Sequence, residues 1–198
     1  MKFTVCGRNR NRLETGEDMT KREAKEREFS LRVMEKEDTD RIVGWRNQDF
    51  VRRCFIYQKD FTREGHENWI RTMIDTGLAV QFIICIGQRP VGSVYLRDID
   101  RTHQKAEYGI FVGERDAWGQ GAGTWAAGEM IRYAFEKEGL HKLMLRVLAE
   151  NKGAIRSYEK AGFVKEAYLR DEVFLEGKYK DVIYMAVINE KESREGME

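Results

Sequence analysis

The sequence predicts a mixed α/β (α+β) domain in which helices pack on the faces of one sheet. Runs with strand-like alternation are interspersed with runs of helical spacing, without a strict βαβ order. Two pairs of strand-like runs are joined by short turn signals, as in antiparallel hairpins. A glycine-rich turn stands between one strand-like run and the longest helical run.

The first predicted elements are a strand and two helices. Residues 29–33 alternate between apolar and polar side chains, which indicates a strand. Residues 38–48 have helical spacing and place Ile42 and Trp45 on one face. Thr62 can cap a second helix, because its hydroxyl can accept a hydrogen bond from a free N–H group of the first turn.

Strands and helices then alternate to the end of the domain. Apolar runs at 79–86 and 91–96 flank a Gly-Gln-Arg-Pro turn, which predicts a hairpin, and residues 106–112 form another strand. After the glycine-rich turn, a helix runs to about Glu138. The remaining predicted elements are a strand at 141–149, a helix at 152–160 and a final hairpin of strands 163–175 and 178–188.

Both ends of the chain differ from this globular pattern. Residues 1–28 carry charges of both signs among few apolar residues. This pattern is typical of a solvated helix or a loose arm, although such an arm can also bind a partner. We therefore expect the domain to span residues 29–190, followed by a short tail at 191–198.

Bulk composition excludes several classes of function. In the 198 residues, 35 Lys and Arg nearly cancel 34 Asp and Glu, and a net charge of +1 gives no global field to attract nucleic acid or an anionic membrane. Cys6, Cys54 and Cys85 are far apart, which suggests neither a disulfide framework nor a zinc site, so no metal is expected. The sequence shows no signal peptide and no membrane-spanning run, and we expect a cytoplasmic protein.

The glycine-rich turn predicts an anion site. Gly119, Gly121 and Gly123 let the backbone approach a ligand closely, and the N–H groups at the start of the following helix point outward. A tight turn without any ligand would show the same glycines. A P-loop would need Gly-Lys-Ser/Thr, and Thr124 stands where a dinucleotide fingerprint has its third glycine, so both of those motifs fit poorly.

A second pattern follows the next strand. Asn151 lies at the strand end, where its amide can bind an extended ligand, and Tyr158 lies two helical turns later, where a phenol can protonate a departing thiolate. Taken separately, Asn151 would be interpreted as a helix cap and Tyr158 as a packing residue.

Together these patterns resemble the GCN5-related N-acetyltransferases (GNAT family). The acetyl-CoA motif of that family, Gln/Arg-x-x-Gly-x-Gly/Ala, fits residues 118–123 except at Trp118, which leaves one pyrophosphate contact to backbone donors. The block from Asn151 to Phe163 resembles the second motif of the family, including its catalytic tyrosine. The order of elements matches over residues 29–188.

The resemblance implies a GNAT-like, mostly antiparallel central sheet with helices on both faces. It also implies acetyl-CoA as cosubstrate, with Tyr158 as general acid and Glu107 as general base, directly or through water. Glu107 could equally be a surface or ion-pairing residue. The residues implied to bind acetyl-CoA, in part through main-chain groups in a splayed gap between strands, are Ile110, Phe111, Val112, Trp118, Gly119, Gln120, Gly121, Ala122, Gly123, Thr124 and Asn151.

The acceptor is expected to be a small-molecule or peptide amine, bound over the early helices by Trp45, Arg46 and Asn47. From the residues alone, a core position for Trp45 and a solvated Arg46 are slightly favoured over a binding role. Together with the segments 98–100, 106–109 and 139–143, these residues resemble a branch that includes aminosugar-nucleotide N-acetyltransferases and, almost equally, ribosomal-protein N-terminal and spermidine acetyltransferases. A polyamine site should be acidic, whereas Arg46, Arg52 and Arg53 make this region basic, which favours an anionic acceptor such as an aminosugar nucleotide. A non-catalytic acyl-CoA-binding or partner-binding module and a homodimer stay open.

Overall fold

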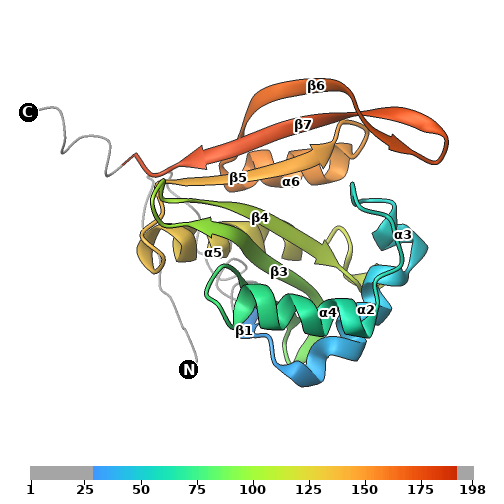
Figure 1. Cartoon of the computed structure of the whole chain (residues 1–198), viewed down its shortest axis with the longest axis vertical. Helices are drawn as coiled ribbons and strands as arrows, with labels where there is room; N and C mark the ends of the chain where they lie inside the picture. Colours follow the sequence, from blue (N-terminus) through green and yellow to red (C-terminus); the bar gives the residue numbers. More distant parts are fainter. Residues whose placement is uncertain (1–28, 191–198) are drawn as a thin grey trace, which may run out of the picture.

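The computed structural model describes residues 29–190, which form one seven-stranded sheet with helices on both faces (Figure 1). The predicted arm at 1–28 and tail at 191–198 lie outside the described residues. The strand order is β1-β2-β3-β4-β5-β7-β6, and every neighbouring pair is antiparallel except β4 and β5. The strands are β1 (Phe29–Val33), β2 (Val80–Ile86), β3 (Arg89–Asp100), β4 (Lys105–Val112), β5 (Lys142–Leu148), β6 (Val164–Leu175) and β7 (Lys178–Ile188).

The helices confirm the predicted order of elements, and the start of one strand differs from the prediction. They are η1 (Lys36–Asp38), α2 (Thr39–Asn47), α3 (Asp49–Arg52), α4 (Arg63–Trp69), the π-helical turn η2 (Ile70–Ile74), η3 (Arg115–Ala117), α5 (Ala122–Glu136) and α6 (Lys152–Ala161). Thr62 caps α4 as predicted, by accepting a hydrogen bond from the Gly65 N–H at 3.0 Å. Arg89 and Pro90, predicted as turn residues, belong to β3 because they pair with the end of β2.

Alternate residues of β2 build two cores, one on each face of the sheet. Phe82 and Ile84 pack in a cluster with α5, which approaches the sheet closely because it presents small buried residues such as Ala126. Ile83 and Cys85 pack on the other face, in a cluster with the apolar residues of α2 and η2. The predicted mixed sheet with helices on both faces is therefore confirmed.

The sheet splits between its two parallel strands. β4 pairs with β5 over three positions, of which the last joins Glu107 to Met144. Beyond this point, β4 continues to pair with β3, and β5 continues to pair with β7 as far as Leu148. Main-chain groups of residues 108–112 on β4 and 145–148 on β5 therefore face each other across a gap instead of forming a ladder.

Candidate active site

A cavity of about 820 Å³ opens at this split and extends between the helices of both faces. Most of the residues predicted for the site line it, although the sequence separates them by more than one hundred positions. Those lining residues are Arg46, Glu107, Ile110, Phe111, Val112, Trp118, Gly119, Gly121, Ala122, Gly123, Thr124, Asn151 and Tyr158. Gln120, Trp45 and Asn47 do not line the cavity.

The first turn of α5 lies open at one end of the cavity. Gly121 is the residue before the helix and has φ +93°, a left-handed conformation that favours glycine. No side chain of the described part of the chain, residues 29–190, caps the helix, and its first turn carries no acidic residue. The first N–H groups of a helix have no intrahelical acceptor, so this turn presents donors and the positive end of the helix dipole to the cavity.

Side chains of α6 add positive charge beside this turn. The Ser157 and Thr124 hydroxyls are hydrogen-bonded at 2.8 Å, which ties α6 to the start of α5. Arg156 and Lys160 line the cavity, and neither forms an ion pair within residues 29–190. Sequence reasoning missed both cations, although their spacing of four residues on one helix places them on a shared face.

Trp118 stands where the resembled motif has Arg or Gln. It contacts the end of β4 and occupies one of the main-chain groups that were predicted to bind acetyl-CoA, the Val112 carbonyl. Its indole N–H donates to the Val112 carbonyl at 2.9 Å, so that carbonyl already has a donor. The Arg115 guanidinium stacks 4.3 Å from the centre of the Trp118 ring. Gln120 points elsewhere, because its side-chain amide donates to the Asp116 carbonyl at 2.7 Å.

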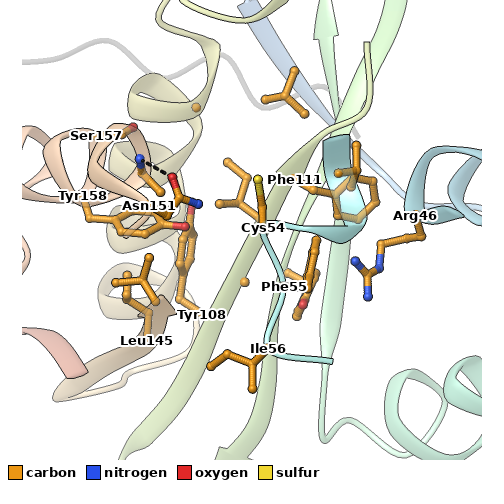
Figure 2. Close-up of a pocket in the computed structure, with 18 of the residues that line it drawn as sticks. Arg46, Cys54, Phe55, Ile56, Tyr108, Phe111, Leu145, Asn151, Ser157 and Tyr158 are labelled. Carbon is orange, nitrogen blue, oxygen red and sulfur yellow. Dashed lines mark hydrogen bonds between the residues drawn. The ribbon is translucent and has the colours of Figure 1, made fainter. Parts of the chain in front are cut away.

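Asn151 combines the two interpretations of its sequence position. Its side-chain oxygen caps α6 by accepting a hydrogen bond from the Ala154 N–H at 3.1 Å. Figure 2 shows the amide nitrogen of the same side chain pointing into the cavity. One side chain can therefore fix the start of α6 and still offer a donor to a ligand.

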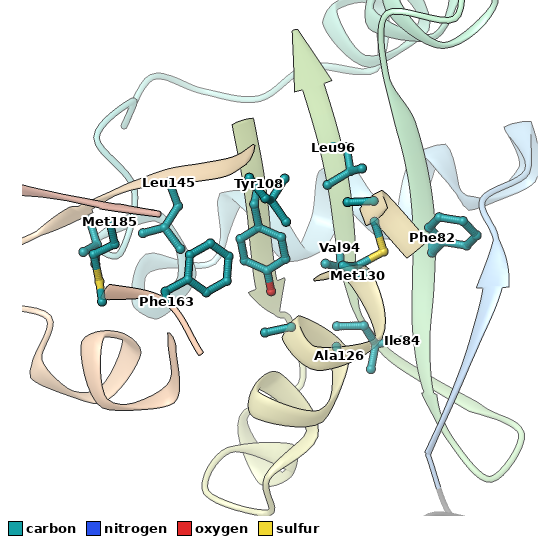
Figure 3. Packing of buried hydrophobic residues seen from close by; sticks show 14 of the residues in the cluster. Phe82, Ile84, Val94, Leu96, Tyr108, Ala126, Met130, Leu145, Phe163 and Met185 are labelled. Atoms are coloured by element: carbon teal, nitrogen blue, oxygen red, sulfur yellow. The ribbon is translucent and has the colours of Figure 1, made fainter. Parts of the chain in front are cut away.

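Tyr158 lies on α6 with its ring packed against the core. The ring makes edge contacts with Tyr108 and Phe163 at centroid distances of 5.9 and 6.0 Å, and Figure 3 shows these two partners side by side. Its hydroxyl forms no hydrogen bond with any residue in the range 29–190, so the proton is not committed elsewhere. Desolvation by burial raises the pKa of Tyr158 above its usual value, and the phenol therefore stays protonated at neutral pH.

Glu107 lies at the last paired position of β4, where the split begins. Its carboxylate is half-buried and weakly ion-paired with Arg146 at 3.4 Å. Arg97 is its partner in the β3–β4 register and also lines the cavity. The carboxylate thus faces the cavity between two arginines, at the mouth of the strand gap.

Trp45 and Asn47, predicted to bind the acceptor, have structural contacts instead. Trp45 is 3% exposed, donates to a Glu114 side-chain oxygen at 2.8 Å, and packs against Gly113, where a Cβ atom would lie 2.1 Å from the indole. Asn47 exchanges two hydrogen bonds with the main chain of Phe61, at 2.8 and 2.9 Å. These two side chains hold α2 in place behind the cavity, and neither is carried into the function proposed below.

Arg46 is the member of this trio that reaches the cavity. Its guanidinium stacks on the Phe55 ring, 3.3 Å from the centroid. Tyr95 reaches the same region from β3 by crossing β4 at Gly109, where a Cβ atom would lie 2.3 Å from the Tyr95 ring. Sequence reasoning missed Tyr95 and Phe55, because nothing in their local pattern indicates a cavity.

These features fit acetyl-CoA in the chemistry they offer. The uncapped turn of α5 and two free cations suit a pyrophosphate, and the unpaired strand edges suit an extended arm that carries amide groups. Residues 29–190 contain no group of three or more His, Cys, Asp or Glu side chains arranged to hold a metal ion. In the same range, no helix is long and apolar enough to cross a membrane.

Comparison with known proteins decides the family. A model of the acetyltransferase (GNAT) domain matches residues 28–164. The chain belongs to the GNAT acetyltransferase family. It is an acetyl-CoA-dependent N-acetyltransferase, as the resemblance implied.

Several relatives of this GNAT enzyme cover most of its length. A spermidine N(1)-acetyltransferase of Vibrio cholerae is 27% identical, with 83% of this chain and 95% of the relative covered. The probable N-acetyltransferase YjcK of Bacillus subtilis is 30% identical, with 80% of this chain and 93% of the relative covered. The putative ribosomal N-acetyltransferase YdaF of the same organism is 26% identical, with 81% of this chain and 91% of the relative covered. The V. cholerae spermidine enzyme in complex with CoA and spermine has a TM-score of 0.77 at 27% identity, with 83% of this chain and 97% of that chain covered.

We expect acetyl-CoA to stabilise this GNAT domain without a metal. A ligand that binds only the native state raises the unfolding midpoint, by about 5–10 °C for a chain of this size at roughly 100 times Kd. The measurement is a thermal melt with acetyl-CoA, with and without chelator. A midpoint that does not move, or a shift that chelator abolishes, would contradict the prediction.

Proposed function

We propose that the protein acetylates a primary amine by direct transfer from acetyl-CoA, within one complex of enzyme and both substrates. The observation that carries this proposal is the Tyr158 hydroxyl, which has no partner within residues 29–190 and shares a cavity with the uncapped turn of α5 and the strand gap. A pyrophosphate at α5 and an extended arm along β4 would bring the thioester toward this hydroxyl.

Each residue of the site then has a defined role, through its main chain or its side chain. Ala122, Gly123 and Thr124 donate main-chain N–H groups to the pyrophosphate, with Arg156 and Lys160 beside them. Main-chain groups of Ile110 and Phe111, and the Asn151 amide nitrogen, bind the arm. Tyr158 protonates the departing thiolate, and Glu107 takes the proton of the acceptor amine, directly or through water.

Direct transfer is favoured over a covalent acetyl-enzyme. Cys54 lines the cavity and is the thiol that such an intermediate would use. Desolvation by burial raises the pKa of Cys54, so at neutral pH it is a thiol and a poor nucleophile. Initial rates measured while both substrates are varied should therefore give intersecting double-reciprocal lines.

For the acceptor, the relatives support a polyamine, because several of them are named spermidine N-acetyltransferases. The aminosugar nucleotide favoured by the sequence has no counterpart among the relatives named above. The V. cholerae spermidine enzyme has also been solved as a dodecamer, which supports self-association of this chain as well.

The test is thiol release from acetyl-CoA with a panel of spermidine, an N-terminal peptide and a UDP-linked aminosugar, followed by mass spectrometry of the amine. We expect thiol release to depend on the amine and to equal the acetylated product. Binding of acetyl-CoA without release for any amine would instead favour a non-catalytic module. Parallel double-reciprocal lines that Cys54→Ala abolishes would refute direct transfer.

A further inference from the structure

Arg46 is a half-buried cation that has no anionic partner within residues 29–190. Its Nη1 atom is buried and has no hydrogen-bond partner, and the guanidinium forms no ion pair with any residue between 29 and 190. Burial lowers the pKa of Arg46, yet an arginine remains charged at neutral pH. Partial burial of a charge without a counter-ion costs stability, so a partner from outside the chain would relieve that cost.

Aromatic rings hold this guanidinium in one orientation. It stacks on Phe55 at 3.3 Å and lies 5.2 and 5.9 Å from the centres of the Phe61 and Phe111 rings. Stacking on Phe55 covers one flat face of the guanidinium, and because Nη1 is buried, the edge formed by Nε and Nη2 is the one left for hydrogen bonds to a ligand. A planar fork fixed in this way suits the two oxygens of a phosphate or carboxylate.

The other charges around the cavity favour the same ligand chemistry. Its lining cations are Arg46, Lys59, Arg97, Arg146, Arg156 and Lys160, and its lining carboxylates are Asp60 and Glu107. Both carboxylates have arginine partners: Asp60 pairs with Arg52 at 3.1 Å, and Glu107 pairs with Arg146 at 3.4 Å. Arg156 and Lys160 are assigned to the pyrophosphate, and Arg97 pairs with Asp98 at 2.8 Å. Within residues 29–190, Arg46 and Lys59 are then the lining cations without an ion pair that remain for the acceptor, and they would repel a polycation and attract an anionic group.

His66 adds a second unpartnered nitrogen to this side of the cavity. Its Nδ1 atom lies 3.0 Å from the Thr39 hydroxyl, while its Nε2 atom is buried and, within residues 29–190, has no partner at hydrogen-bond geometry. Burial lowers the pKa of His66, so the ring is neutral at pH 7. The ring contributes a neutral polar group and no negative charge that would favour a polyamine.

We propose that Arg46 binds an anionic group, a phosphate or carboxylate, of the amine that the enzyme acetylates. Figure 2 shows Arg46 on the opposite side of the cavity from Tyr158 and Asn151, with Phe55 between them. The acceptor therefore carries its amine at one end and its negative charge at the other. This inference rests on the proposed function, the acetylation of a primary amine, and for the acceptor it sets the charges of the cavity against the polyamine that the relatives support.

The experiment compares two probes that differ by one phosphate, glucosamine 6-phosphate and glucosamine, together with spermidine. Their Kd values are measured by calorimetry with CoA at saturation, so the result does not require turnover. The wild type should bind the phosphorylated sugar at least about 10-fold more tightly than glucosamine, because charge-assisted hydrogen bonds are stronger than neutral ones. Spermidine should bind more weakly than the phosphorylated sugar.

Variants assign the effect to one side chain. Arg46→Gln should reduce the preference for the phosphorylated sugar to about twofold or less, and Arg46→Lys should keep part of it, because charge remains while the planar fork is lost. Arg53→Gln is the matched control, since Arg53 is exposed and does not line the cavity. That variant should keep the wild-type preference. Melting temperatures and the Kd of CoA check that each variant is folded.

Equal affinity for the two sugars in the wild type would overturn the inference, as would tighter binding of spermidine. An unchanged preference in Arg46→Gln would show that another cation binds the phosphate. If the preference depends on Arg46 but no amine in the panel is acetylated, the anion site stands and the proposed function fails.

Discussion

Replacing Tyr158 by phenylalanine should lower kcat and kcat/KM together by about 10²–10⁴-fold, the usual contribution of a general acid. The ring and its contacts with Tyr108 and Phe163 remain, so the melting temperature and the Kd of acetyl-CoA should change little. The measurement is steady-state kinetics of thiol release, combined with calorimetry of acetyl-CoA binding.

Tyr179→Phe is the matched control. Tyr179 is 65% exposed on β7 and does not line the cavity, so the loss of its hydroxyl should leave kcat at the wild-type value. Wild-type turnover in a normally folded Tyr158→Phe variant would show that water or another group protonates the thiolate. A lowered melting temperature with unchanged kcat would assign Tyr158 a structural role.

The pH dependence follows from the same hydroxyl. Burial raises the pKa of Tyr158 above the ordinary value of about 10, so its acid form persists to higher pH than that of an exposed phenol. The rate should rise with pH as the acceptor amine loses its proton, and it should show no fall from Tyr158 below about pH 10. A basic limb near pH 8 that disappears in Tyr158→Phe would contradict this assignment.

Replacing Gly121 by valine should weaken acetyl-CoA binding by at least about 10- to 100-fold, because the main-chain donors of the α5 turn would no longer meet the pyrophosphate. A valine at φ +93° is also strained, at roughly 1–2 kcal/mol, so the unfolding midpoint should fall by several degrees. Calorimetry on the folded variant gives the affinity, and a thermal melt gives the stability.

Gly139→Val separates the two effects. Gly139 has φ +64° beyond the end of α5, does not line the cavity, and has no atom within 4 Å of the Cβ position. The variant should therefore suffer similar backbone strain and a similar loss of midpoint while keeping its affinity for acetyl-CoA. If Gly121→Val also keeps that affinity, the turn is not the pyrophosphate site.

Much of the fold was predictable because its signals are local. The alternation in β2, the Thr62 cap of α4 and the glycine turn before α5 each depend on a few neighbouring residues and their preferred dihedral angles. Element boundaries were less predictable. Arg89 and Pro90 joined β3 because an edge of β2 was available to pair with them, which is a non-local fact.

The site residues also divide into those predicted from local motifs and those whose contacts come from distant segments. Tyr158, Asn151 and the glycine turn were predicted from motifs, and the structure brings them into one cavity, although their binding and catalytic roles stay predictions. Gln120 and the Val112 carbonyl were predicted as ligand contacts but have protein partners in Asp116 and Trp118. Other segments of the protein compete with a ligand for hydrogen bonds to the same groups, and spacing along the chain does not show which partner a group binds.

The sequence by itself determined the family, the acetyl donor and the order of elements. The glycine turn and the Asn151-to-Tyr158 spacing are local patterns that each lie within a short stretch of the chain. Only the tertiary structure decided how the trio Trp45, Arg46 and Asn47 divides. Successive helix residues point about 100° apart, so Trp45 packs behind the cavity while Arg46 enters it. Which of those directions meets core and which meets a ligand depends on β4 and on the loop that carries Phe55, both of which reach α2 only after folding.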